Sequence, residues 1–120
     1  IFGDYERFGR KTGYSLVGGC YYSARLAVAE KLRDERKQAG IIILREAYPG
    51  YVPLGVWNVR ENMRAAMRLG HKSFGSFGEA CSYAASRLKI SMGTWLQHST
   101  LFREEFVQKR LSDFARLQVV

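Results

Sequence analysis

The sequence has few of the residues that build metal centres or disulfide frameworks. Its 120 residues include only two cysteines, Cys20 and Cys81, far apart and outside any CxxC pattern, and two histidines, His71 and His98. Because a structural zinc site needs four such ligands at short spacings, we expect no metal or other cofactor within this chain. The two cysteines are expected to be buried thiols, as in a reducing, cytoplasmic compartment.

Other familiar signals are missing too. No apolar run approaches the roughly 20 residues of a membrane span, so we expect no membrane partner, and no signal peptide is visible at the start. A GxSxG motif, a Ser-His-acid arrangement and a phosphate-binding loop are absent from the sequence, which leaves enzymatic activity undecided. The chain opens at Ile1-Phe2-Gly3 rather than at methionine, and we expect it to be the C-terminal part of a larger protein.

Positive charge is what the sequence has in excess. Its 19 Lys and Arg residues against 11 Asp and Glu residues give a formal net charge of +8. Basic domains favour polyanionic partners because they neutralise phosphates. DNA is therefore one expected partner, and simple solubility or an acidic partner domain is the plain alternative.

The stretch Ile41–Glu61, IIILREAYPGYVPLGVWNVRE, organises our prediction of the fold. Two apolar runs, each ending in an Arg-Glu pair, flank a connection with proline and glycine. Such runs predict an antiparallel strand pair over residues 41–48 and 53–60. The fold class expected is α+β: a small, largely antiparallel sheet centred on this pair and covered by four to five helices.

Helical periodicity predicts the elements that cover the sheet. The expected helices span residues 20–38, 58–69, 76–89, 91–98 and 100–117. In the first, the expected apolar stripe is Tyr22, Leu26, Ala29 and Leu32, widened by Ala24 and Val28, and Gly40 is the expected C-terminal glycine. Ser76 and Glu79 form an S-x-x-E capping box before the third. We expect one domain over residues 1–120, with residues 1–19 as an opening segment and 108–120 as a possible docking tail.

Basic side chains recur every four residues after the second predicted strand, and with one from the first helix they are the candidate nucleic-acid contacts: Arg25, Arg60, Arg64, Arg68 and Lys72. Like charges at this spacing repel, so a bound polyanion is one explanation and an ordinary solvated face is the other. Nearby aromatic residues could stack on unpaired bases. Of these, Tyr22 and Trp57 are expected in the core, whereas Tyr48 and Tyr51 could be either buried or exposed.

Glu46 and Glu61 are the candidates for paired-carboxylate chemistry, as in a nuclease-like, phosphate-directed enzyme. In the predicted strand pair they would lie several residues out of register, which weakens acid–base pairing. The alternative is that each glutamate neutralises a nearby arginine at a strand end, in a structural ion pair.

Three stretches together resemble the C-terminal domain of the archaeal Nre family of DNA-repair proteins: GGCYYSARLAVAEKL, RKQAGIIILREAYPGYVPLGVWNVRENMRAAMR and RLKISMGTWLQHSTLFREEFVQKRLSDF. The resemblance covers about residues 18–114, and LREAYPGYVPLGVWNVRE is its most specific part. It implies a role in genome maintenance in the archaeal cytoplasm. It also implies a larger N-terminal domain with a cysteine-rich zinc motif, and so contact with the rest of its own protein.

The resemblance further implies a C-terminal motif that docks on the sliding clamp. The pattern is a glutamine, two residues, an aliphatic residue, two residues and two aromatic residues. Gln108, Leu111 and Phe114 match it, but Ala115 stands where the second aromatic belongs. Losing one ring implies weaker docking. The alternative is that Leu111 and Phe114 belong to the core of the last helix.

Overall fold

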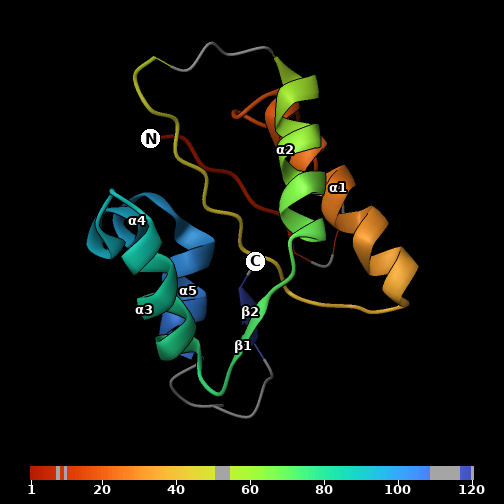
Figure 1. Ribbon diagram of the computed structural model, residues 1–120. Coiled ribbons are helices and arrows are strands. Elements are labelled where there is room, and N and C mark those ends of the chain that lie inside the picture. Colours follow the sequence, from red (N-terminus) through yellow and green to blue (C-terminus); the bar gives the residue numbers. More distant parts are fainter. Residues whose placement is uncertain (8, 10, 51–54, 109–116, 120) are drawn as a thin grey trace. The chain divides into compact units, whose positions relative to one another are not determined.

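The computed structural model describes residues 1–7, 9, 11–50, 55–108 and 117–119. This part of the chain is mostly helical (Figure 1): α1 (Gly19–Glu35), α2 (Val56–Arg68), β1 (Lys72–Phe74), α3 (Phe77–Arg87), α4 (Met92–His98), α5 (Thr100–Gln108) and β2 (Leu117–Val119). It forms two compact units, one of residues 2–70 and one of residues 71–120 with Ile1. None of the helices in the described ranges is long and apolar enough to cross a membrane.

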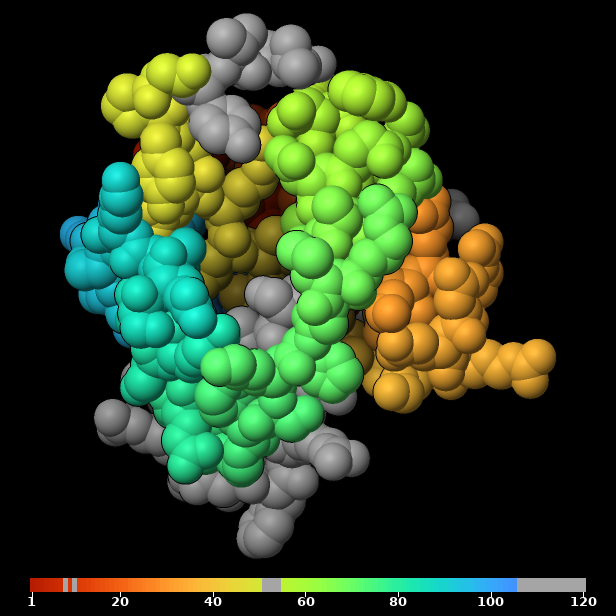
Figure 2. Space-filling model, in the orientation of Figure 1, coloured from red at the N-terminus to blue at the C-terminus, as the bar shows by residue number. Residues whose placement is uncertain are grey.

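The 2–70 unit is built on α1 and α2, which pack along their lengths (Figures 1 and 2). The two helices run in the same direction, because Gly19 at the start of α1 lies against Val56 at the start of α2, and Glu30 farther along α1 binds Arg64 of α2. Ala27, Val28 and Val59 are buried. The long connection after α1 therefore returns the chain to the end where α1 began.

Gly19 permits the close approach of the two helices. A Cβ atom at this position would lie 2.5 Å from Val56 Cγ1, a distance at which the Val56 side chain or one of the two helices must shift. Gly19→Ala is therefore expected to lower the free energy of unfolding by about 1–2 kcal/mol, as overpacking commonly does. Val56→Ala in the same chain should remove most of that loss. Urea denaturation of the parent, both single variants and the double variant measures this coupling, and additive effects would show that the two positions do not touch.

Helix α1 ends at Glu35, five residues before the predicted glycine. Arg36 adopts the left-handed conformation, with φ of 53°, and the N–H of Lys37 donates to the carbonyl of Leu32 at 2.9 Å. This is a Schellman C-cap formed without glycine. Of the predicted apolar stripe, Val28 is buried as expected, whereas Leu26 is exposed and Ala27, outside the stripe, is buried.

Serine N-caps start each of the three helices that the structure describes in the 71–120 unit. The Oγ atoms of Ser76, Ser91 and Ser99 accept hydrogen bonds from backbone N–H groups in the first turns of α3, α4 and α5, at 3.2–3.3 Å. The capping serine predicted before α3 is thus confirmed. The buried apolar residues of this unit are Ala80, Cys81, Trp95 and Phe102. Strands β1 and β2 pair antiparallel with Ser73 opposite Gln118.

The predicted α+β fold with a strand pair at 41–48 and 53–60 is wrong. Residues 41–47 have no regular secondary structure, and Ile41, Ile42 and Ile43 are 36–40% exposed. The second predicted strand is instead the first turns of α2, with residues 51–54 outside the described ranges. Val and Trp favour strands locally, but Val59, Met63 and Met67 recur at helical spacing, and packing on α1 selects the helix.

Candidate nucleic-acid interface

Aromatic side chains stand exposed near the shared start of α1 and α2. Tyr14 is 74% exposed and Trp57 is 57% exposed. The Tyr14 ring lies 5.1 Å from the Tyr22 ring, and its hydroxyl is 3.9 Å from the Cβ position of Gly19. Trp57 directly follows Val56, which also contacts Gly19. The prediction that Trp57 belongs to the core is therefore wrong, and Tyr14 is an exposed ring that the sequence did not single out.

Tyr14, Tyr21 and Tyr22 form a tyrosine cluster, and polar contacts hold the chain before α1 against it. The backbone N–H of Ser15 donates to the Tyr22 hydroxyl at 3.1 Å. Lys11 binds Asp4 at 2.6 Å, and this hydrogen bond lowers the pKa of Asp4 to about 2. Burial, with the charge of a neighbouring glutamate, raises the pKa of Tyr21 to about 12, so its hydroxyl stays protonated at neutral pH. The hydrogen bond from Ser15 thus ties the opening segment to α1, and the Lys11–Asp4 ion pair stabilises that segment itself.

Arg25, one of the predicted contacts, faces the same cluster. Its guanidinium carbon lies 4.8 Å from the centre of the Tyr22 ring. One of its nitrogens donates to both carboxylate oxygens of Glu6, at 3.0 and 3.3 Å. Arg25 therefore carries a largely neutralised charge, and its contribution to this surface is a flat guanidinium stacked near tyrosine.

Arg64 links α2 to α1. It donates to both oxygens of Glu30, at 2.7 and 3.0 Å, and to Glu61 at 2.9 Å. The hydrogen bonds from Arg64 lower the pKa of Glu30, and the same bonds to Glu30 raise the pKa of Arg64. Both carboxylates therefore share one guanidinium, and the bonds to Glu30 make Arg64 a link between the two helices.

The other three predicted basic residues lie in different environments. Arg60 Nε is 3.7 Å from Glu61 and is buried without a hydrogen bond. Arg68 is exposed, is the last residue of α2, and makes no ion pair within the described ranges. Lys72 belongs to β1 in the other unit, because the helix ends before Gly70, whose φ is 95°. Among the residues that the structure describes, Arg68 is thus the cation of the α2 stripe that has no ion-pair partner.

The starts of α1 and α2 share an unusual local structure. Each follows a glycine with positive φ, Gly18 at 77° and Gly55 at 83°, and neither helix has a side-chain cap or an acidic residue in its first turn. The first N–H groups of both helices therefore lack side-chain acceptors, and their dipoles make this end of the helix pair partially positive.

The two candidate carboxylates have separate partners. Glu46 accepts a hydrogen bond from the Tyr48 hydroxyl at 2.8 Å, which raises the pKa of Tyr48. Glu61 lies on α2 rather than at a strand end and accepts from Arg64. Within the described residues, no three His, Cys, Asp or Glu side chains gather as metal ligands would. Each of the two carboxylates is thus engaged by a different neighbouring side chain, Tyr48 for Glu46 and Arg64 for Glu61.

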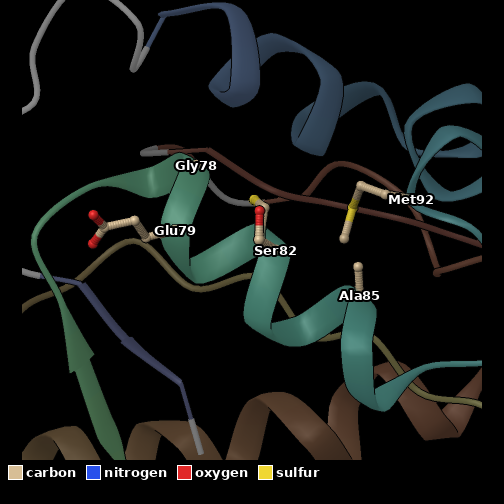
Figure 3. Close-up of a pocket in the computed structure, with 6 residues that line it drawn as sticks. Gly78, Glu79, Ser82, Ala85 and Met92 are labelled. Carbon is tan, nitrogen blue, oxygen red and sulfur yellow. The ribbon is translucent and has the colours of Figure 1, made fainter.

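A shallow groove beside α3 offers little reactive chemistry. It is lined by Gly78, Glu79, Cys81, Ser82, Ala85 and Met92. The Met92 side chain points toward Ala85 (Figure 3). Burial raises the pKa of the Cys81 thiol, which keeps it protonated and weakly nucleophilic. The groove is therefore an apolar surface feature, not a reactive cysteine site.

The predicted clamp-docking residues lie at the end of the described chain. Gln108 is the last residue of α5, and Leu111 and Phe114 fall outside the described residues. Strand β2 follows at Leu117–Val119 and pairs with β1. The motif is thus flanked by a helix on one side and a paired strand on the other.

Comparison with known proteins gives a consistent set of relatives. The family model described as archaeal Nre, C-terminal, matches residues 6–114. DNA repair protein NreB of Archaeoglobus fulgidus is 41% identical over 104 residues, 86% of this chain and 27% of that protein. DNA repair protein NreA of the same organism is 42% identical over 87 residues, 72% of this chain and 22% of that protein.

DNA repair protein NreA of Haloferax volcanii is 31% identical over 114 residues, which is 93% of this chain and 27% of that protein. The chain thus spans about a quarter of the length of the curated relatives it matches. No solved structure matches it.

Proposed function

We propose that this chain, which belongs to the archaeal Nre family as its C-terminal domain, is a nucleic-acid-binding and scaffolding module of a DNA repair protein. The names of its relatives support the repair context. The observation that carries the binding role is the exposed Trp57 on a helix face that ends in a free cation, Arg68. The remainder of the full-length protein is a further proposed partner.

Trp57 and Arg68 are placed to contact one strand of nucleic acid. They are 11 residues apart on α2, so they lie on nearly the same face, about three turns or 17 Å apart. An exposed indole can stack on an unpaired base whatever its identity, and an arginine neutralises a phosphate. Unpaired bases offer their faces only in single-stranded DNA, so we propose single-stranded DNA as the ligand.

The charge of the 2–70 unit agrees with this ligand. It holds 12 basic and 7 acidic residues. Several of its carboxylates are already paired within the unit, among them Asp4, Glu6 and Glu30. A strand that approaches this unit therefore meets a net positive surface, which favours association with phosphates.

Two arginines of α2 provide the test and its matched control. Arg68→Gln should leave the thermal midpoint of the 120-residue chain unchanged. It should also reduce the slope of log K against log salt for a labelled single-stranded oligonucleotide by about 0.7, the value for one lost phosphate contact. Arg64→Gln should lower the thermal midpoint, because it leaves two carboxylates, Glu30 and Glu61, without their shared partner.

Fluorescence anisotropy at several salt concentrations and circular dichroism make both measurements. A parent chain that fails to bind the oligonucleotide at low salt would refute the proposed function. A parent that binds while Arg68→Gln keeps the full salt slope would remove Arg68 from the interface.

We also propose that Gln108, Leu111 and Phe114 dock this module on the sliding clamp. The spacing of these three residues supports the proposal, since it matches the family's docking pattern at all but one position, Ala115. In this mode the leucine and phenylalanine fill an apolar pocket on the clamp while the glutamine makes polar contacts beside it.

A further inference from the structure

Two cations of the 71–120 unit converge on one aromatic ring. Lys72 Nζ lies 4.8 Å from the centre of the Tyr83 ring, and Arg87 Cζ lies 5.3 Å from it. The lysine comes from β1 and the arginine from α3, one turn beyond Tyr83. Two positive groups from different elements therefore contact the same ring.

The ring that gathers these cations is itself fixed. Tyr83 is half-buried, and the Phe74 ring of β1 lies 5.3 Å from it at an interplanar angle of 39°. The backbone of Lys72 is held by strand pairing, with Lys72 opposite Val119 of β2. The lysine, the arginine and the ring thus start from a preorganised arrangement, which reduces the entropy lost when a ligand binds.

The described part of the chain supplies no carboxylate partner for either cation. Within the described ranges, neither Lys72 nor Arg87 makes an ion pair, and both side chains are exposed. The nearest acidic residue along α3 is Glu79, one turn before Tyr83, and its Oε2 lies 3.8 Å from the Cβ position of Gly75 instead. Two uncompensated charges near one ring repel each other, and a shared anion relieves that repulsion.

We propose that Lys72, Tyr83 and Arg87 form a phosphate-contact site for the backbone of the bound nucleic acid. The ammonium group supplies a compact charge, and the forked guanidinium supplies two parallel donors for phosphate oxygens. This site rests on the proposed function and adds a contact in the 71–120 unit. Lys72 follows the α2 arginines at the same four-residue spacing in the sequence, but in this proposal it acts with Arg87 in the other unit.

The test compares two double variants with the same change in charge. Lys72→Gln/Arg87→Gln should reduce the salt slope for a single-stranded oligonucleotide by about 1.4, corresponding to two lost phosphate contacts at about 0.7 each. The control, Lys89→Gln/Arg103→Gln, alters two other cations of the same unit and should lower the slope by less than half as much. Tyr83→Leu keeps both charges but removes the ring that positions them. It should weaken binding at fixed salt and leave the salt slope nearly unchanged.

Equal slopes for the two double variants would overturn the site and leave only a general charge effect, with the proposed function intact. Absence of binding by the parent chain would instead refute the proposed function. Thermal unfolding checks that each variant is folded, and Lys72→Gln alone, which alters one exposed side chain, replaces the double variant if that one does not fold. A single variant with the parent's slope would then overturn the site.

Discussion

Trp57→Ala is expected to weaken binding of single-stranded DNA by about 10-fold or more while changing the free energy of unfolding by less than about 0.5 kcal/mol. Stacking one base on an aromatic side chain contributes about 1–3 kcal/mol, whereas exposed substitutions seldom alter stability. The chain contains a matched control in Trp95, which is only 7% exposed. Trp95→Ala should lower the free energy of unfolding by about 3–5 kcal/mol, because it empties a buried site.

Intrinsic fluorescence separates the two tryptophans. In a Trp95→Phe chain the remaining indole is Trp57, and a single-stranded oligonucleotide should quench its emission as bases stack on it. In a Trp57→Phe chain the buried Trp95 should show no such quenching. A Trp57→Ala chain that unfolds as readily as Trp95→Ala would contradict the exposed position, and full affinity in a folded Trp57→Ala chain would contradict the stacking role.

The helices could be predicted well from the sequence because their signals are local. Apolar periodicity located α1, α2, α3 and α4 to within a few residues, and Ser76 marked the start of α3. The stretch 41–61 could not be predicted, because its β-branched and aromatic residues suit a strand locally. Helix α2 begins 21 residues after α1 ends, and its packing on α1 makes this part of the stretch helical. No local sequence pattern carries that information.

The candidate site was harder to predict than the helices. Residue type places Trp57 in the core, yet it lies two positions before buried Val59, about 200° around the helix and thus on the opposite face. Extending the helical pattern back to Val56 would have shown this. The bond from Arg64 to Glu30 joins residues 34 apart, so only the folded helix pair reveals that this arginine is already engaged.

The docking tail should bind the archaeal sliding clamp weakly. A peptide of residues 107–120 carries Gln108, Leu111 and Phe114 but lacks the second aromatic residue. We expect Phe114→Ala to abolish binding, since it removes the remaining ring. Ala115→Phe should tighten binding by about 1–2 kcal/mol, the contribution of one more buried aromatic side chain. Ser112→Ala lies outside the motif and serves as the control.

Within the whole chain, strand β2 should oppose this docking. It begins three residues after Phe114 and pairs with β1, so the clamp must accommodate a motif whose far end is tied to the domain. A chain ending at Arg116 lacks β2, and it should bind the clamp more tightly than the full chain does. Isothermal calorimetry on the peptides and on both chains measures these differences. If neither the parent peptide nor its Ala115→Phe variant produces heat, this segment does not dock on the clamp, and the shortened chain should then show no gain in affinity.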